Sequence, residues 1–346
     1  MKRLLEMLSY TRAHQSEGER LFVDKFINPY NPEVYKSGNE VLAYVVTVGG
    51  KKRPPVLWSS HVDTVHSMDD AVMQTVHYDE SGGFVYKDDG KPLGADDGAG
   101  VWLLLEMIDA KVAGTYIFHR GEECGGIGSS GMAKHHKEWL SQFKWAIAFD
   151  RRGDGDVITE QSRGVCASNE FAQQLSTLLN ISGMSYAPSD MGIFTDTANY
   201  RNIIPECTNV SVGYDNEHTG NETLDAWHLS KLRNVMVSFN TQIINSLPAL
   251  RDHTIVDEWD AYGKWSYPTP KRFKSVPHSN AQQDCVTLEA EEIICMTYKK
   301  LVKLVTDSDP HDVADLISRL AEDASYMREQ YEDSVYYDDS SRRVYK

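Results

Sequence analysis

Histidine, aspartate and glutamate residues occur in this sequence where short apolar segments begin or end. They are His61 with Asp63, Asp96 with Asp97, Glu122 with Glu123, His218 with Glu222, and Asp150 at the end of WAIAFD. Each alone is a weak signal, because polar residues at such positions are commonly helix caps or turn residues. Carboxylates that converge at one place repel one another, so the whole set predicts a divalent metal ion among them. Imidazole and carboxylate ligands without thiolate favour zinc, or manganese or cobalt in a similar site.

The segments that carry these residues alternate between strand and helix patterns. Short apolar runs typical of strands lie at 41–48, 56–60, 115–119 and 145–150, and a helix pattern covers 98–114. This alternation predicts an α/β fold, a three-layer α/β/α sandwich with a mixed, largely parallel central sheet. Ligands bind past the carboxyl ends of the strands in such sheets, and the polar residues stand at those ends.

The character of the sequence changes near residue 250. We expect a first domain at 1–250 and a second region at 251–346, with an irregular arm, two helices at 288–305 and 311–331, and an acidic tail. The last helix has an apolar stripe formed by Val313, Ile317, Leu320, Ala324, Met327 and Tyr331. A narrow stripe of this kind packs on another helix, either of the same chain or of a second copy. The C-terminal helices are therefore a candidate contact for a homo-oligomer.

The composition of the 346 residues disfavours several classes of protein. Lys and Arg number 35 against 51 for Asp and Glu, a formal net charge of −16, so the chain would repel a nucleic acid backbone. No run approaches the roughly 18 apolar residues that a membrane-spanning helix needs. The N-terminal segment resembles an amphipathic helix more than a signal peptide, which predicts a cytoplasmic protein. The five cysteines are scattered without a CxxC pair, so we expect no disulfide framework.

The polar residues lie in five ordered motifs: HVD at 61–63, GADDGAG at 94–100, GEECGG at 121–126, FDR at 149–151 and NEHTGNETL at 216–224. This set resembles the co-catalytic zinc metallopeptidases that include bacterial leucyl aminopeptidases, peptidase T and the glutamyl aminopeptidases. The resemblance covers residues 1 to about 235 of this chain. It implies the zinc-exopeptidase fold and two bound divalent metal ions. Zn²⁺ is the preferred ion, and Co²⁺ or Mn²⁺ are the alternatives.

The resemblance also implies a role for each motif residue. Asp96 would bridge the two ions, His61 and Asp150 would complete one of them, and Glu123 and His218 the other. Three further roles follow from the same resemblance: Glu122 would be the general base, Asp63 would accept the second ring N–H of His61, and Asp97 would follow a peptide bond that is often cis. The chemistry agrees, because two ions that activate water beside a free carboxylate can hydrolyse an amide.

Spacing distinguishes the branches of this family. His218 follows Asp150 by 68 residues (218 − 150), too few for the separate lid domain of peptidase T and the aminoacylases, and Asp96 follows His61 by only 35 (96 − 61), too few for an inserted dimerisation domain. The leucyl aminopeptidase branch carries SD and an aromatic residue where this chain has SDMGIF at 189–194. We therefore take Met191 and Phe194 as candidate substrate-binding residues, although Met191 stands where that branch commonly has histidine. Arg151 is a further candidate, because it directly follows Asp150 and could hold a substrate carboxylate.

The reading that these patterns favour is an aminopeptidase that acts on short peptides. A carboxypeptidase or an amide deacylase could use the same metal site, because the ligands do not determine which end of the substrate is held. An acidic residue that holds a free amine would favour the aminopeptidase, and an arginine that holds a carboxylate would favour the carboxypeptidase. A non-catalytic interaction protein with the same fold is the remaining alternative. Loss of ligand residues would be its sign, and none is lost.

Overall fold

The computed structural model describes residues 1–50, 53–161, 164–254, 335–337 and 343–345. The chain divides into two units, Met1–Trp265 and Ser266–Lys346. In the second unit, the described strands β15 (Val335–Tyr337) and β16 (Arg343–Tyr345) pair antiparallel. The two C-terminal helices expected at 288–305 and 311–331 lie outside the described residues, so the oligomer contact and the boundary after 250 stay predictions.

A mixed sheet of eight strands forms the centre of the first unit. Its order is β1 (Glu33–Ser37), β2 (Glu40–Val48), β6 (Gly114–His119), β3 (Val56–His61), β7 (Trp145–Arg151), β12 (Glu206–Ser211), β8 (Asp156–Ile158) and β11 (Ala187–Ser189). The four central strands β6, β3, β7 and β12 are parallel, whereas β1, β2 and β8 each join the sheet antiparallel to a neighbour. The predicted largely parallel sheet is confirmed.

The four central strands are buried along almost their whole length because both of their faces are covered. Successive side chains of a strand point to opposite faces, so Trp58 of β3 joins one hydrophobic cluster and Leu57 the other. In β7, Phe149 lies in the first cluster and Ala146 in the second. The ring of Trp58 stacks on that of Phe149, with the centroids 6.1 Å apart. Two separate cores, one on each side, therefore fix the sheet in the middle of the fold.

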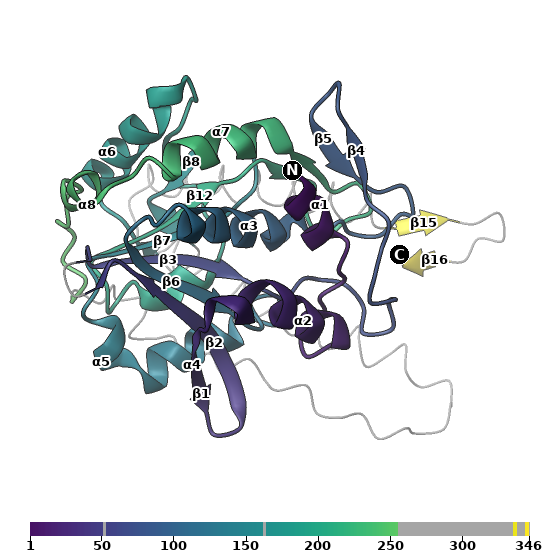
Figure 1. Ribbon diagram of the computed structural model, residues 1–346, viewed down its shortest axis with the longest axis horizontal. Helices are drawn as coiled ribbons and strands as arrows, with labels where there is room; N and C mark the ends of the chain where they lie inside the picture. Colours follow the sequence, from purple (N-terminus) through teal and green to yellow (C-terminus); the bar gives the residue numbers. More distant parts are fainter. Residues whose placement is uncertain (51–52, 162–163, 255–334, 338–342, 346) are drawn as a thin grey trace, which may run out of the picture. The chain divides into compact units, whose positions relative to one another are not determined.

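Helices cover both faces of the sheet (Figure 1). On one face, α3 (Ala95–Asp109) packs on β3 and β7, α1 (Lys2–Leu8) and α7 (Ala226–Met236) pack on α3, and α6 (Asn169–Leu179) packs on β8 and β11. On the other face, α4 (Ile127–His135) packs on β2 and is followed by α5 (Lys137–Leu140). This arrangement confirms the predicted three-layer sandwich.

Shorter elements complete the first unit. The helices are α2 (Glu17–Phe22), its π-helical continuation Val23–Ile27 and α8 (Thr241–Asn245). A small sheet has the order β13 (Tyr214–Asp215), β14 (Thr223–Asp225), β5 (Phe84–Tyr86) and β4 (His77–Asp79), and β9 (Glu160–Gln161) pairs with β10 (Gly164–Val165). No helix in the described ranges is long and apolar enough to cross a membrane.

The helix expected at 98–114 ends earlier than its apolar pattern indicated. The cause is a C-terminal cap: Lys111 adopts a left-handed backbone with φ of +62°, and the N–H of Val112 donates to the carbonyl of Met107 at 3.0 Å. At the other end, a Cβ on Gly100 would lie 2.0 Å from the carbonyl oxygen of Phe149. Only glycine lets α3 approach β7 so closely, and this approach brings the GADDGAG motif to the strand that carries Asp150.

Candidate metal centre and active site

The predicted ligands lie at one end of the parallel strands. His61 is the last residue of β3, Asp150 is near the end of β7, and Glu122 and Glu123 stand in the turn after β6. Asp96 lies at the start of α3, where its backbone is not helical (φ −78°, ψ 105°). His218 comes from the loop between β13 and β14. These loops meet because the carboxyl ends of parallel strands lie at the same edge of a sheet.

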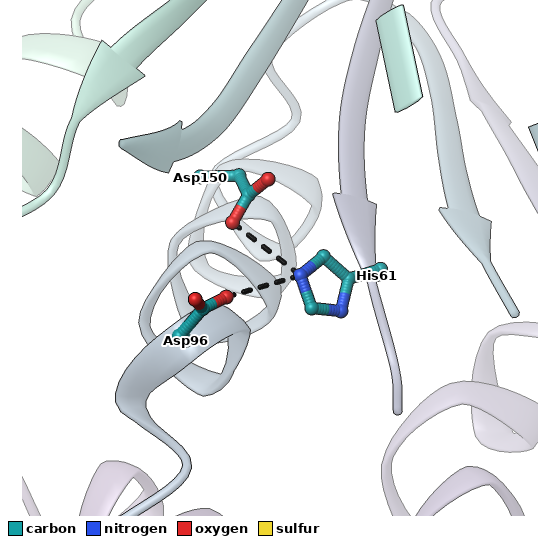
Figure 2. A group of neighbouring side chains, drawn as sticks. All are labelled: His61, Asp96 and Asp150. Carbon is teal, nitrogen blue, oxygen red and sulfur yellow. Dashed lines mark hydrogen bonds and ion pairs between the residues drawn. The ribbon is translucent and has the colours of Figure 1, made fainter. Parts of the chain in front are cut away.

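Two groups of three side chains share Asp96. In the first, Nε2 of His61 lies 3.1 Å from Oδ1 of Asp96 and 3.3 Å from Oδ1 of Asp150 (Figure 2). In the second, Nε2 of His218 lies 3.1 Å from Oδ2 of Asp96 and 3.1 Å from Oε1 of Glu123. Each group offers one ligand atom per residue, and the three atoms lie within 4.8 Å of one another. The structure thus brings together all five predicted ligands, and Asp96 presents a different oxygen to each group.

Asp63 differs in one respect from what the sequence analysis expected. Nδ1 of His61 donates to the main-chain carbonyl of Asp63 at 3.0 Å, while the Asp63 carboxylate is 3.8 Å away. That carboxylate instead accepts the main-chain N–H groups of Gly121 at 2.8 Å and of Glu122 and Glu123 at 3.2 Å each. The expectation that the Asp63 carboxylate binds His61 is therefore wrong. The main chain orients His61, and the carboxylate holds the turn that carries the two glutamates.

Asp97 and Glu222 also hold main-chain groups rather than joining either group of ligands. The peptide bond between Asp96 and Asp97 is cis, as the family resemblance implied. The Asp97 carboxylate accepts from the Ser60 hydroxyl and from the N–H groups of His61 at 3.2 Å and Gly100 at 3.0 Å. The buried Glu222 carboxylate accepts the N–H groups of Leu93, Gly94 and Asp96 at 2.8, 2.9 and 3.1 Å. Both residues fix the segment that presents Asp96.

The buried Arg12 is a contributor that the sequence analysis did not identify. Its guanidinium donates to the carbonyl oxygens of Val62 at 2.9 Å and Gly94 at 2.8 Å, and it lies 4.6 Å from the centre of the Phe22 ring. Burial lowers the pKa of Arg12 to about 10, against the attraction of nearby carboxylates such as Glu222, so it stays charged at neutral pH. Its only signal in the sequence is a charge that interrupts the apolar pattern of the N-terminal segment.

The close carboxylates raise one another's proton affinity. Burial, together with Asp96, raises the pKa of Glu123 to about 7 and that of Asp150 to about 6, and burial raises the pKa of Glu122 well above its ordinary range. Hydrogen bonds to Asp96 and Glu123 raise the pKa of His218 to about 11. In the metal-free protein, the hydrogen bonds between these carboxylates and the imidazoles of His61 and His218 therefore retain protons. Metal binding requires deprotonated carboxylates and neutral imidazoles, so a cation here would replace those protons.

A pocket of about 220 Å³ opens beside the two groups. Asp96, Glu122, Asp150 and His218 line it, together with Arg151, Arg152, Ile158, Gln161, Gly192, Ile193, Phe194, Asn209, Tyr214 and Glu217. The side-chain amide of Asn209 supports Asp150: its Oδ1 accepts the main-chain N–H of Asp150 at 2.9 Å, and its Nδ2 donates to the carbonyl of Asp150 at 2.7 Å. The Tyr214 hydroxyl donates to Oδ1 of Asp150 at 3.2 Å. The sequence holds no local signal for Asn209, whereas Glu217 could have been noticed as the neighbour of His218.

The three candidate substrate-binding residues have different positions. Phe194 and Arg151 line the pocket, but the Arg151 guanidinium is engaged by Asp156, with Nε and Nη2 each 2.9 Å from Oδ2. Met191 is 71% exposed and is absent from the pocket lining, so its placement there was wrong. The loop turns inward only at Gly192, where a Cβ would lie 2.2 Å from the carbonyl oxygen of Glu160.

A three-layer α/β sandwich that gathers histidines and carboxylates at the ends of its parallel strands is an architecture of metal-dependent hydrolases. Residues 43–238 match peptidase family M28, and this match covers more than half of the chain. The chain belongs to this family and is a metal-dependent exopeptidase. No curated protein matches the sequence.

Several solved structures share the fold. The aminopeptidase PepT of Bacillus cereus is 15% identical with a TM-score of 0.55, and a tripeptidase of Staphylococcus aureus is 16% identical with a TM-score of 0.54; each match covers 70% of this chain and 97% of that chain. The TET1 peptidase of Pyrococcus horikoshii, described as forming a tetrahedron or an octahedral shell, is 15% identical with a TM-score of 0.50, over 68% of this chain and 98% of that chain. At such identities the likeness establishes the fold alone.

Proposed function

We propose that this protein is an aminopeptidase that removes N-terminal residues from short peptides with the help of two divalent metal ions. The observation that carries the proposal is the position of Asp96, which offers one oxygen to each of two ligand groups at a pocket that Glu122 also lines. At about 220 Å³, this pocket is smaller than the roughly 300 Å³ at the lower end for small-molecule sites. A space of that size suits one end of a peptide rather than its middle.

The residues fit two ions of the zinc type. His61 and Asp150 would complete one site and Glu123 and His218 the other, with Asp96 shared. Nitrogen and oxygen ligands of this kind suit Zn²⁺, with Co²⁺ or Mn²⁺ as alternatives. Two such ions, when bound, polarise the scissile carbonyl and make water more acidic.

Glu122 is the proposed general base. It lines the pocket, it is the immediate neighbour of the proposed ligand Glu123, and neither ligand group includes it. Its carboxylate would accept a proton from the attacking water and pass that proton to the nitrogen of the leaving amine. Asp63 would support this transfer as a positioning residue, because its carboxylate holds the main chain of Glu122 and Glu123.

Two observations favour an aminopeptidase over a carboxypeptidase. Arg151, which directly follows Asp150, is already paired with Asp156 through Nε and Nη2, which disfavours it as the group that holds a substrate carboxylate. Solved structures with the same fold include proteins described as an aminopeptidase and a tripeptidase. The presence of all five proposed ligand residues, in two groups that could each hold an ion, argues against a non-catalytic role. A cytoplasmic location and assembly into a homo-oligomer remain predictions from the sequence.

Mass spectrometry of a mixed peptide library would test the proposal. The metal-free protein, the protein loaded with zinc, cobalt or manganese, and the loaded Glu122→Gln variant would be compared. We expect stepwise loss of N-terminal residues that depends on metal, and a fall in kcat of about 10²- to 10⁴-fold in the variant while its metal content stays unchanged. Trimming from the C-terminus would indicate a carboxypeptidase. An absence of cleavage with two metals bound would contradict the proposal.

A further inference from the structure

We propose that Glu217 binds the free α-ammonium group of the substrate, so that the enzyme is specific for peptides with an unblocked N-terminus. The inference rests on the proposed aminopeptidase function and adds the residue that selects the substrate. Four acids line the pocket: Asp96, Glu122, Asp150 and Glu217. The first three have proposed tasks as ligands or general base. Glu217 is the acid that the chemistry of bond cleavage leaves unused.

The loop between β13 and β14 turns Glu217 toward the pocket. Its neighbours Asn216 and His218 both adopt left-handed backbone conformations, with φ of +55° and +65°. Such values are uncommon outside glycine and are often found where a functional side chain must be presented. Asn216 and His218 are exposed, whereas the side chain of Glu217 between them is only 20% exposed. The backbone conformation thus places an acid inside the cavity next to a proposed metal ligand.

The two oxygens of the Glu217 carboxylate have different surroundings. Oε1 lies 3.3 Å from Nη1 of Arg152, whose side chain is 46% exposed. Oε2 is buried and has no hydrogen-bond partner among the residues that the structure describes. An unpaired buried carboxylate oxygen is costly, and a ligand that brings N–H donors to it gains a charge-assisted hydrogen bond. A primary ammonium group has both the positive charge and the donors that this oxygen lacks.

The covalent geometry of a peptide agrees with this placement. The N–Cα and Cα–C bonds measure about 1.46 and 1.52 Å, so the α-nitrogen lies within roughly 3 Å of the scissile carbonyl carbon of the first residue. The group that binds the amine must therefore share the small cavity of the metal site. Glu217 does so, since it lines the same cavity as Glu122 and immediately precedes His218. The ammonium group would bind the Glu217 carboxylate on the side that lines the cavity, beside the contact of Oε1 with Arg152.

The experiment compares paired substrates that differ only in the amine. Leucine p-nitroanilide and its des-amino analogue, 4-methylpentanoic acid p-nitroanilide, would be given to the zinc-loaded wild type, Glu217→Gln and the control Asp215→Asn. Asp215 is an exposed acid at the end of β13, two residues before Glu217 and outside the pocket lining. We expect Glu217→Gln to lower kcat/KM for the amine substrate by roughly 10- to 100-fold, as for one lost charge-assisted hydrogen bond, and to leave the des-amino substrate nearly unaffected. The control should behave as the wild type.

A binding measurement separates recognition from turnover. Calorimetric titration with leucine hydroxamate and its des-amino analogue should show the same selective loss in Glu217→Gln, with metal content and circular dichroism unchanged. If the wild type requires the amine and Glu217→Gln still requires it equally, or loses both substrates in equal measure, the assignment of Glu217 is overturned while the aminopeptidase function stands. If the wild type itself is indifferent to the amine, the aminopeptidase proposal fails and this inference fails with it.

Discussion

Replacing Asp96 by alanine should remove both of the proposed metal ions, whereas replacing Glu123 should remove one. Asp96 contributes Oδ1 to the group with His61 and Asp150, and Oδ2 to the group with Glu123 and His218. The Asp96→Ala variant leaves two ligands in each group. The Glu123→Ala variant leaves the group around His61 complete. The two variants each remove one carboxylate, so they are matched in charge and differ in the number of groups affected.

The magnitude follows from the linkage between binding and folding. A ligand at about 1,000 times its Kd stabilises the folded state by about 4 kcal/mol per site, so two sites supply about 8 kcal/mol. Asp96→Ala should lose nearly all of this metal-dependent stabilisation and Glu123→Ala about half. In the metal-free protein Asp96 also pairs with His61 and His218, so its removal changes the stability of that state as well. Each variant is therefore compared with its own metal-free form.

Urea unfolding with and without zinc would measure the stabilisation, and elemental analysis of the dialysed protein would give the number of ions. The expected numbers of ions are two for the wild type, one for Glu123→Ala and none for Asp96→Ala. If Asp96→Ala retained one ion and half of the stabilisation, Asp96 would belong to a single group and the shared-ligand interpretation would be refuted.

Two further predictions concern the residues around the ligands. Asp63→Asn should lower zinc affinity or kcat by about 10- to 100-fold, because an amide –NH₂ group would face the N–H of Glu123; equal zinc affinity and equal kcat in the variant would contradict this. The thermal unfolding midpoint (Tm) of the metal-free protein should decrease as the pH is raised from 5 to 8. The raised pKa values of Glu123 (about 7) and Asp150 (about 6) give stability that is lost as pH rises above their ordinary values of 4.5 and 3.8, and the stability from the raised pKa of His218 is lost above pH 6.5. Calorimetry should show this decrease of Tm with pH in chelator-treated protein and a smaller decrease in zinc-loaded protein. A Tm of the metal-free protein that does not change with pH would contradict the raised pKa values of these groups.

The sequence indicated which of these side chains lie together because its signals are local. Each ligand stands beside an apolar run, and a run of buried strand residues followed by a polar residue is visible within about six positions. Once the strands form a parallel sheet, their ends meet without further information. The positions of His61 and Asp150 follow directly from this rule.

The contacts that the sequence did not predict join segments that lie far apart along the chain. The Asp63 carboxylate binds main-chain groups of a turn 58 to 60 residues away, and Arg12 binds carbonyl groups 50 and 82 residues away. Neither contact leaves a periodic pattern in the sequence. The Met191 error has a different origin, because Gly192 rather than Met191 is the point at which the loop meets Glu160.

The main-chain contacts of Arg12, Asp63 and Glu222 have a consequence for evolution. Each of these buried side chains recognises N–H or carbonyl groups of a loop, and every amino acid except proline supplies both groups. Substitutions in the loops can therefore accumulate without moving the ligands, provided that the three anchoring residues persist. The solved structures that share this fold at 15 and 16% identity show that the architecture tolerates extensive change of sequence. In distant homologues, these anchors should be more informative markers of descent than the other loop residues, those outside the proposed ligands and Glu122.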